Sequence, residues 1–132
     1  MALADWADLV VVALSFNTVQ TQNMPTIWID ADACPKPVKD IVFRASARTK
    51  TAVVMVANQY IPKPTSSLIR AVQVEKGFDK ADDYIVLSSQ AGDLIVTQDI
   101  PLAAECMDKG VIAIHPRGAL YNKDTIKQKL AM

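Results

Sequence analysis

From residue 24 onward, the apolar positions follow two alternating patterns, one typical of strands and one typical of helices. Short apolar runs predict strands at 26–29, 51–57, 94–97 and 111–114. The run at 51–57 is continuous and rich in β-branched residues, which is typical of a strand covered on both faces. A further run at 68–74 alternates and predicts a strand that would suit the edge of the sheet.

Helical spacing separates these strands. The apolar residues Val38, Ile41, Val42 and Ala45 share one helix face, with Pro37 in its first turn. Three more helices are expected at 79–88, 101–109 and 122–131. Asp79 and Asn122 are suitable N-caps for the first and last of them, and Gly110 closes the middle one. Strands that alternate with helices predict a three-layer α/β domain, with a mostly parallel sheet and helices on both faces.

The first 23 residues differ from the rest in composition. Residues 1–23 contain no Lys, Arg, Pro or Gly, and their apolar residues have helical spacing. We interpret 1–23 as an extension outside a single domain at 24–132. The apolar run at 9–14 is too short to cross a membrane, and Asp5 and Asp8 before it argue against a signal peptide. We therefore expect a cytoplasmic protein without a membrane segment.

Charge and cysteine content exclude several classes of protein. Fourteen Lys and Arg residues balance fourteen Asp and Glu residues, so the chain is not a strongly basic nucleic-acid binder. Cys34 and Cys106 form no CxxC or zinc pattern, and free thiols in a reducing compartment are expected. The four glycines do not have the spacing of a phosphate-binding loop, which argues against ATP, GTP or dinucleotide binding by such loops.

Carboxylates follow two of the predicted strands. Asp30 and Asp32 come after the first strand, and Asp99 follows the strand at 94–97. In a parallel sheet these side chains lie at the carboxyl edge, where α/β proteins bind ligands. Converging carboxylates repel one another unless a cation, a proton or water intervenes. Mg²⁺ and Mn²⁺ prefer oxygen ligands, so this pattern favours a metal site.

Other polar residues allow both a structural and a functional interpretation. Asp79, Asp82 and Asp83 add carboxylates at the start of a helix, but a cap and an acidic first turn also explain them without a metal. Asn58 follows the second strand and lines either the same edge or a turn. Lys36 and Arg117 are candidate phosphate ligands, although scattered basic residues usually belong to a solvated surface.

Five motifs stand out along the chain: IWIDADACPKPVKD (27–40), VANQ (56–59), GFDKAD (77–82), GDLIVTQDIPLAAE (92–105) and HPRG (115–118). Together they resemble the YaiI/YqxD family of uncharacterised bacterial proteins. The resemblance extends from Met24 to Met132, and DADACP together with TQDIPLA makes it specific.

This resemblance implies a PIN-like, Rossmann-like fold with an acidic pocket and, by analogy, a Mg²⁺- or Mn²⁺-dependent ribonuclease. It implies that the acidic, metal-binding and catalytic set is Asp30, Asp32, Asp82 and Asp99. Asp79 and Asp93 also lie within matching motifs and are secondary candidates, together with Asn58 and Thr97. Asp83 stands where the family is not typically acidic and is set aside.

The chain departs from the family pattern at three places. Asp40 stands where the family tends to have Glu, and His115 where Asn is expected. The family usually continues beyond a helix like 122–131 into a further carboxyl-terminal segment. If that segment covers the pocket or completes the core, this form is expected to be less stable, oligomeric or inactive.

Three functions remain open at this level. The first is a cytoplasmic, metal-dependent phosphodiesterase that cleaves RNA. The second is a non-catalytic module that binds RNA or a protein on the same scaffold. The third is a small-molecule phosphohydrolase, because Asp30, Asp32 and Thr97 resemble the strand-end residues of haloacid-dehalogenase-like phosphatases.

Overall fold

A six-stranded sheet forms the centre of the protein. The computed structural model describes residues 25–77 and 79–131. All neighbouring strands are parallel except the last pair, and the order across the sheet is β3-β2-β1-β4-β5-β6. The strands are β1 (Thr26–Asp30), β2 (Ala52–Ala57), β3 (Ile69–Gln73), β4 (Leu94–Val96), β5 (Ile112–His115) and β6 (Ala119–Leu120).

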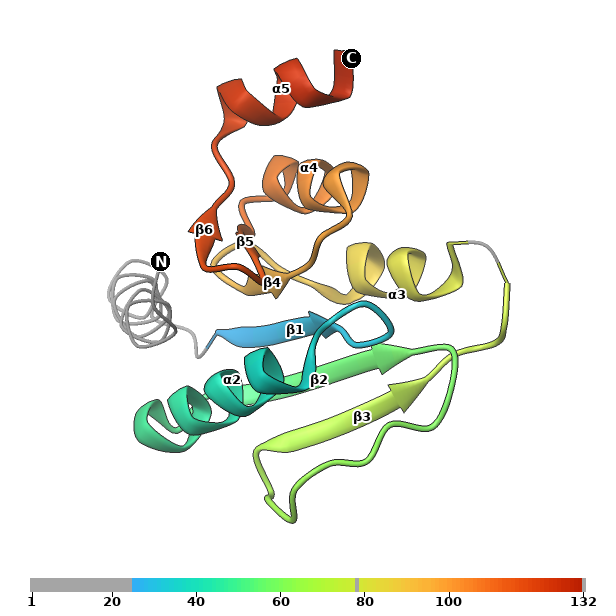
Figure 1. The fold of residues 1–132 in the computed structure, drawn as a ribbon, viewed down its shortest axis with the longest axis vertical. Helices are drawn as coiled ribbons and strands as arrows, with labels where there is room; N and C mark the ends of the chain where they lie inside the picture. The colour runs from blue at the N-terminus through green and yellow to red at the C-terminus, as the bar shows by residue number, and fades with distance from the viewer. Residues whose placement is uncertain (1–24, 78, 132) are drawn as a thin grey trace.

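Helices cover the two faces of this sheet unequally. One face carries α2, which lies along β1 and β2 (Figure 1), and the other carries α3, α4 and α5. The helices are α2 (Lys36–Thr49), α3 (Lys80–Ser88), α4 (Ile100–Asp108) and α5 (Lys123–Ala131). This is the three-layer α/β fold that the sequence predicts. No helix in 25–77 or 79–131 is long and apolar enough to cross a bilayer.

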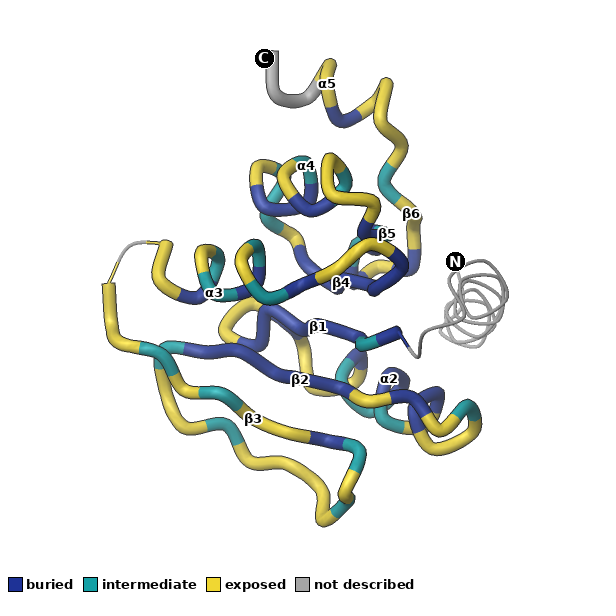
Figure 2. Tube along the Cα trace, turned by 180° about the vertical axis from the view of Figure 1, so that it is seen from behind, coloured by how far each residue is buried: buried dark blue, intermediate teal, exposed yellow. Residues whose placement is uncertain are grey.

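Alternation along β1 divides the core into two apolar clusters. Ile27 and Ile29 point to the α2 side, whereas Trp28 points to the side of α3 and α4. Figure 2 shows that β1 and β2 are mostly buried, while β3 at the edge is mostly exposed. Asp30 has the same parity as Trp28, so its side chain is directed towards α3 and α4 rather than towards α2.

The later strands of the sheet lie on both sides of β1. The chain first builds β2 and β3 on one side of β1, and then returns through α3 to place β4, β5 and β6 on the other side. The sheet therefore has a topological switch point between β1 and β4. Open α/β sheets bind ligands beyond the carboxyl ends of the strands at such a point.

The structure confirms most of the predicted elements, with two differences. Asp79 does not cap α3 with its side chain, because it adopts a left-handed conformation (φ 63°) that turns the chain into the helix. The short strand β6 is not predicted, since its two residues pair antiparallel with β5 only through a tight turn. Asn122 does cap α5, accepting hydrogen bonds at Oδ1 from the backbone of Asp124 and Thr125. The predicted extension 1–23 lies outside the described residues.

Candidate functional site

Asp30, Thr97 and Asp99 are joined by hydrogen bonds at the switch point. The Thr97 hydroxyl donates to Asp30 Oδ2 over 3.2 Å and accepts from the backbone N–H of Asp99 over 3.0 Å. Asp99 in turn caps α4, because its Oδ1 accepts from the backbone N–H of Leu102 over 3.0 Å. Thr97 is almost fully buried, and only 8% of Asp30 is exposed. The end of β1 is thus tied to the start of α4.

An acidic pocket of about 240 Å³ opens beside this junction, between the starts of α3 and α4. Five carboxylates line it, and none of the described residues in its lining is basic. The lining consists of Asp79, Asp82, Asp83, Asp99, Pro101, Leu102 and Glu105. The pocket is therefore suited to a cation or to a ligand that a cation carries.

The carboxylates are close enough to alter one another's ionisation. Burial, followed by the charge of Asp99 and a hydrogen bond with it, raises the pKa of Asp82 from 3.8 to about 7. Asp30 and Asp79 add smaller contributions in the same direction. Burial also raises the pKa of Asp30, against the hydrogen bond from Thr97, which lowers it. The charged form of Asp82 is therefore disfavoured in the folded protein.

Replacing Asp82 by Asn is expected to stabilise the protein above neutral pH. Because the pKa is raised on folding, the folded state binds more protons between pH 4 and 7, and its stability falls as the pH rises through this range. A pKa rise of this size corresponds to about 4 kcal/mol in the free energy of unfolding. Solvent screening at a partly exposed carboxyl reduces this to roughly 1–2 kcal/mol. Urea unfolding of D82N and of the parent at pH 4 and pH 8 measures the difference in their free energies of unfolding.

The gain should appear at pH 8 and vanish near pH 4, where Asp82 is protonated in both states. Asp108→Asn is a matched control, because Asp108 is an exposed carboxylate at the other end of α4. A stability change for D82N that is equal at the two pH values would contradict the assigned cause.

Asp32 lies near the site but in a different environment. It is exposed, and its Oδ2 accepts a hydrogen bond of 2.7 Å from the backbone N–H of Asn58. The Asn58 side chain donates to the backbone carbonyl of Glu75 over 3.1 Å. Asp32 and Asn58 therefore connect the ends of β1 and β2. The charge of Asp32 contributes to the raised pKa of Asp30.

Asp93 does not belong to the site. It is buried at the amino end of β4, at the opposite edge of the sheet from Asp30. Its carboxylate accepts three hydrogen bonds, from the backbone N–H groups of Thr26 and Gln90 and from Trp28 Nε1, each at 2.9–3.0 Å. The secondary assignment of Asp93 to the acidic set is therefore wrong in position, and its role is structural.

The two proposed phosphate ligands flank the switch point on opposite sides. Lys36 begins α2 and pairs with Asp40 over 3.6 Å. Arg117 is exposed in the turn between β5 and β6, two strands away from β1. Neither lines the acidic pocket.

Two residues at the site were not predicted. Glu105 lines the pocket because it lies one helical turn after Pro101, a spacing that could have indicated it. Tyr121 donates from its hydroxyl to the carbonyl of Thr97 over 2.9 Å. Burial and then the charge of Asp99 raise its pKa. No local pattern marks Tyr121, since its partner lies 24 residues away.

The donors of the pocket suit a hard divalent cation. They are carboxylate oxygens, and no basic side chain among the described residues lines the pocket to offset their charge. Within 25–77 and 79–131, however, no three His, Cys, Asp or Glu side chains are arranged to hold a metal ion by themselves. A cation here would therefore need further ligands, such as water or substrate oxygens, beside one or two of these carboxylates.

The cysteines have no features of catalytic nucleophiles. Both are free and buried. Burial raises the pKa of Cys34 to about 11, although Lys39 lowers it, and burial raises that of Cys106 to about 11 as well. Both therefore remain protonated thiols at neutral pH.

Comparisons with known proteins identify the family. Residues 28–132 match the family described as "Uncharacterized BCR, YaiI/YqxD family". A UPF0178 protein of Psychromonas ingrahamii is 56% identical over 107 residues, covering 81% of this chain and 71% of that protein. UPF0178 proteins of Aliivibrio fischeri and Legionella pneumophila are 57% and 55% identical, covering 79% and 81% of this chain and 70% and 72% of those proteins. No solved structure matches the chain. The chain belongs to the YaiI/YqxD family of uncharacterised proteins.

Proposed function

We propose that the protein is a Mg²⁺- or Mn²⁺-dependent phosphodiesterase that hydrolyses RNA. One observation supports this most directly: Asp82 and Asp99 lie in one pocket lined by five carboxylates and, among the described residues, by no basic one, beside the switch point of the sheet. Paired carboxylates without a basic partner are stabilised by a divalent cation. The same pair lines a pocket open to a ligand.

In this proposal Asp82 and Asp99 hold the cation, with Asp30 and Asp32 completing the acidic set. A bound divalent cation supplies an activated water and neutralises charge on the phosphodiester. Thr97 fixes the orientation of Asp30 and of the Asp99 backbone, so the set is held on rigid elements. Asp79 and Glu105 line the same pocket and are available to accept a proton from water.

The substrate's phosphates need positive charge that the pocket itself lacks. Lys36 lies at the amino end of α2, where the helix dipole also favours an anion. Arg117 is exposed in the turn after β5, two strands from β1. These residues would bind backbone phosphates on the two sides of the scissile bond.

The direct test is hydrolysis of labelled single-stranded and structured RNA with Mn²⁺ or Mg²⁺. We expect cleavage that EDTA stops and that an Asp30→Asn variant lacks. Cleavage that is equal in the parent and in D30N would reject the proposed catalytic set. RNA binding without cleavage would favour the non-catalytic module.

Metal binding is testable without a substrate, by thermal unfolding. A cation at about 100 times its dissociation constant stabilises the folded state by about 2.7 kcal/mol, a shift on the order of 10 °C for a domain of this size. The double variant Asp30→Asn plus Asp99→Asn should show no shift. If the parent and the double variant respond equally to Mn²⁺, the cation binds elsewhere.

A further inference from the structure

Two adjoining cavities open on the α2 side of the sheet, along the segment between β2 and β3. The first, of about 410 Å³, lies over β2 and β3 with Met55 and Ala71 in its lining. The second, of about 390 Å³, includes residues of the first two turns of α2. Ile61 and Lys63 line both cavities. We call this continuous surface the lysine groove; its defining residues are Lys36, Lys39, Phe43, Tyr60, Ile61 and Lys63.

The groove is basic although the chain has no net charge. Three lysines line the two cavities against one carboxylate, Asp40, which pairs with Lys36 over 3.6 Å. Lys39 and Lys63 are left to provide the positive excess. This charge is opposite to that of the acidic pocket, and it indicates an anionic occupant.

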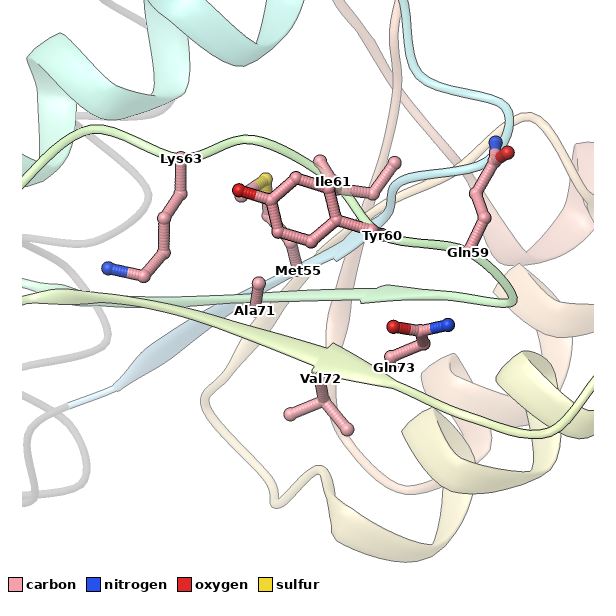
Figure 3. Close-up of a pocket in the computed structure, with 8 residues that line it drawn as sticks. All are labelled: Met55, Gln59, Tyr60, Ile61, Lys63, Ala71, Val72 and Gln73. Atoms are coloured by element: carbon pink, nitrogen blue, oxygen red, sulfur yellow. The ribbon is translucent and has the colours of Figure 1, made fainter.

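An exposed aromatic ring lies in the first of the two cavities. Tyr60 is 77% exposed. Figure 3 shows its ring beside Ile61 and Met55, with Lys63 on one side and Gln59 on the other. An exposed ring next to lysines is the arrangement that stacks an unpaired base while binding the neighbouring phosphates. The amides of Gln59 and Gln73 in the same lining can hydrogen-bond base edges.

The groove borders Asp32 at the carboxyl edge of β1, whereas the acidic pocket lies on the other face of the sheet. The segment that carries Tyr60 and Lys63 starts at Asn58, whose backbone N–H donates to the Asp32 carboxylate. Lys36, at the other border of the groove, begins the helix that follows the Asp30–Asp32 turn. A strand bound in the groove would therefore reach the carboxyl edge of β1 directly.

We propose that the lysine groove binds single-stranded RNA, with one base stacked on Tyr60 and phosphates on Lys39 and Lys63. This inference rests on the proposed function for the identity of the polymer. The inference names the surface that guides the RNA strand. It also predicts a preference for unpaired over duplex RNA, because only an unstacked base is able to cover Tyr60.

The test measures binding rather than cleavage. Fluorescence anisotropy of a labelled single-stranded RNA, in EDTA to prevent hydrolysis, gives the affinity of the parent, of Tyr60→Ala and of Lys63→Gln. Loss of one stacked base is expected to weaken binding by roughly 5- to 150-fold. Lys63→Gln should reduce the steepness of the log–log salt dependence by about 0.7, the value for one phosphate contact on a single strand.

Matched controls lie away from the groove. Leu87→Ala removes another exposed apolar side chain, 83% exposed on α3, and Lys127→Gln removes an exposed charge on α5. Both should bind RNA as the parent does. If the parent fails to bind, or if Tyr60→Ala and Lys63→Gln bind as tightly as these controls, the inference is overturned.

A competitor distinguishes RNA from an acidic protein segment. A poly-glutamate peptide of equal charge should displace the RNA only weakly, because it offers no base to Tyr60. Equal competition by this peptide, with Tyr60→Ala unaffected, would overturn the inference. Binding with the expected variant effects but without metal-dependent cleavage would reject the proposed function alone. Cleavage that is insensitive to Tyr60→Ala and Lys63→Gln, with unchanged RNA binding, would reject the groove alone.

Discussion

Replacing Asp93 by Asn is expected to lower the free energy of unfolding by about 3 kcal/mol, because charge-assisted, buried hydrogen bonds are lost and a donor is left unpaired. The Asp93 carboxylate accepts from three donors. The amide of Asn has one oxygen, so its N–H₂ group would face an N–H donor. The melting temperature should fall by roughly 10–15 °C, as measured by thermal unfolding followed by circular dichroism.

Asp108→Asn, which changes an exposed carboxylate, should leave the melting temperature within a few degrees of that of the parent. Asp93 lies at the amino edge of the sheet, so folded D93N should still be stabilised by Mn²⁺ as the parent is. A loss of less than about 1 kcal/mol would show that the three hydrogen bonds do not stabilise β1 against β4 as argued.

Replacing Asp99 by Asn is expected to reduce metal-dependent RNA cleavage by on the order of 10²–10³-fold, the usual cost of losing one preorganised charged group at a reacting centre. The substitution is conservative for folding. Asn is as good an N-cap as Asp, so its side-chain oxygen can keep the hydrogen bond from Leu102. The measurement is the initial rate at saturating Mn²⁺ and RNA.

Asp108→Asn on the same helix again serves as the control and should cleave at the parent rate. The unfolding free energy of D99N, measured beside its activity, separates the two effects: we expect it to be unchanged or raised. A D99N variant that retains most of the cleavage activity would remove Asp99 from the proposed catalytic set.

The order of strands and helices, and the edge at which the acids meet, follow from patterns within short segments. Asp30 and Asp99 each come directly after an apolar run, and the rule for parallel sheets places both at the carboxyl edge. The parity of β1 also fixes the face: Asp30 shares the face of Trp28, and thus lies on the side of α3 and α4. The edge needs no knowledge of tertiary contacts, whereas the helices that cover this face are known only from the structure.

Features that depend on distant partners were not predictable in the same way. Tyr121 reaches Thr97 only after β6 has turned back along β5. Asp79 looks like a helix cap, yet it adopts a left-handed conformation instead of the extended one usual at an N-cap. Asp93 was assigned to the acidic set because it lies in a matching motif. Its place directly before a strand, rather than after one, already pointed to the opposite edge.

The switch point also has a consequence for folding. β1, β2 and β3 follow one another closely along the chain, whereas the bond between Asp30 and Thr97 spans 67 residues. Loop-closure entropy delays contacts of such long sequence separation until local structure compensates for it. Asp82 and Asp99 can therefore come together with Asp30 only when β4 has inserted beside β1. A newly made chain would hold its carboxylates apart until the sheet is complete, so incompletely folded molecules would carry no assembled acidic pocket.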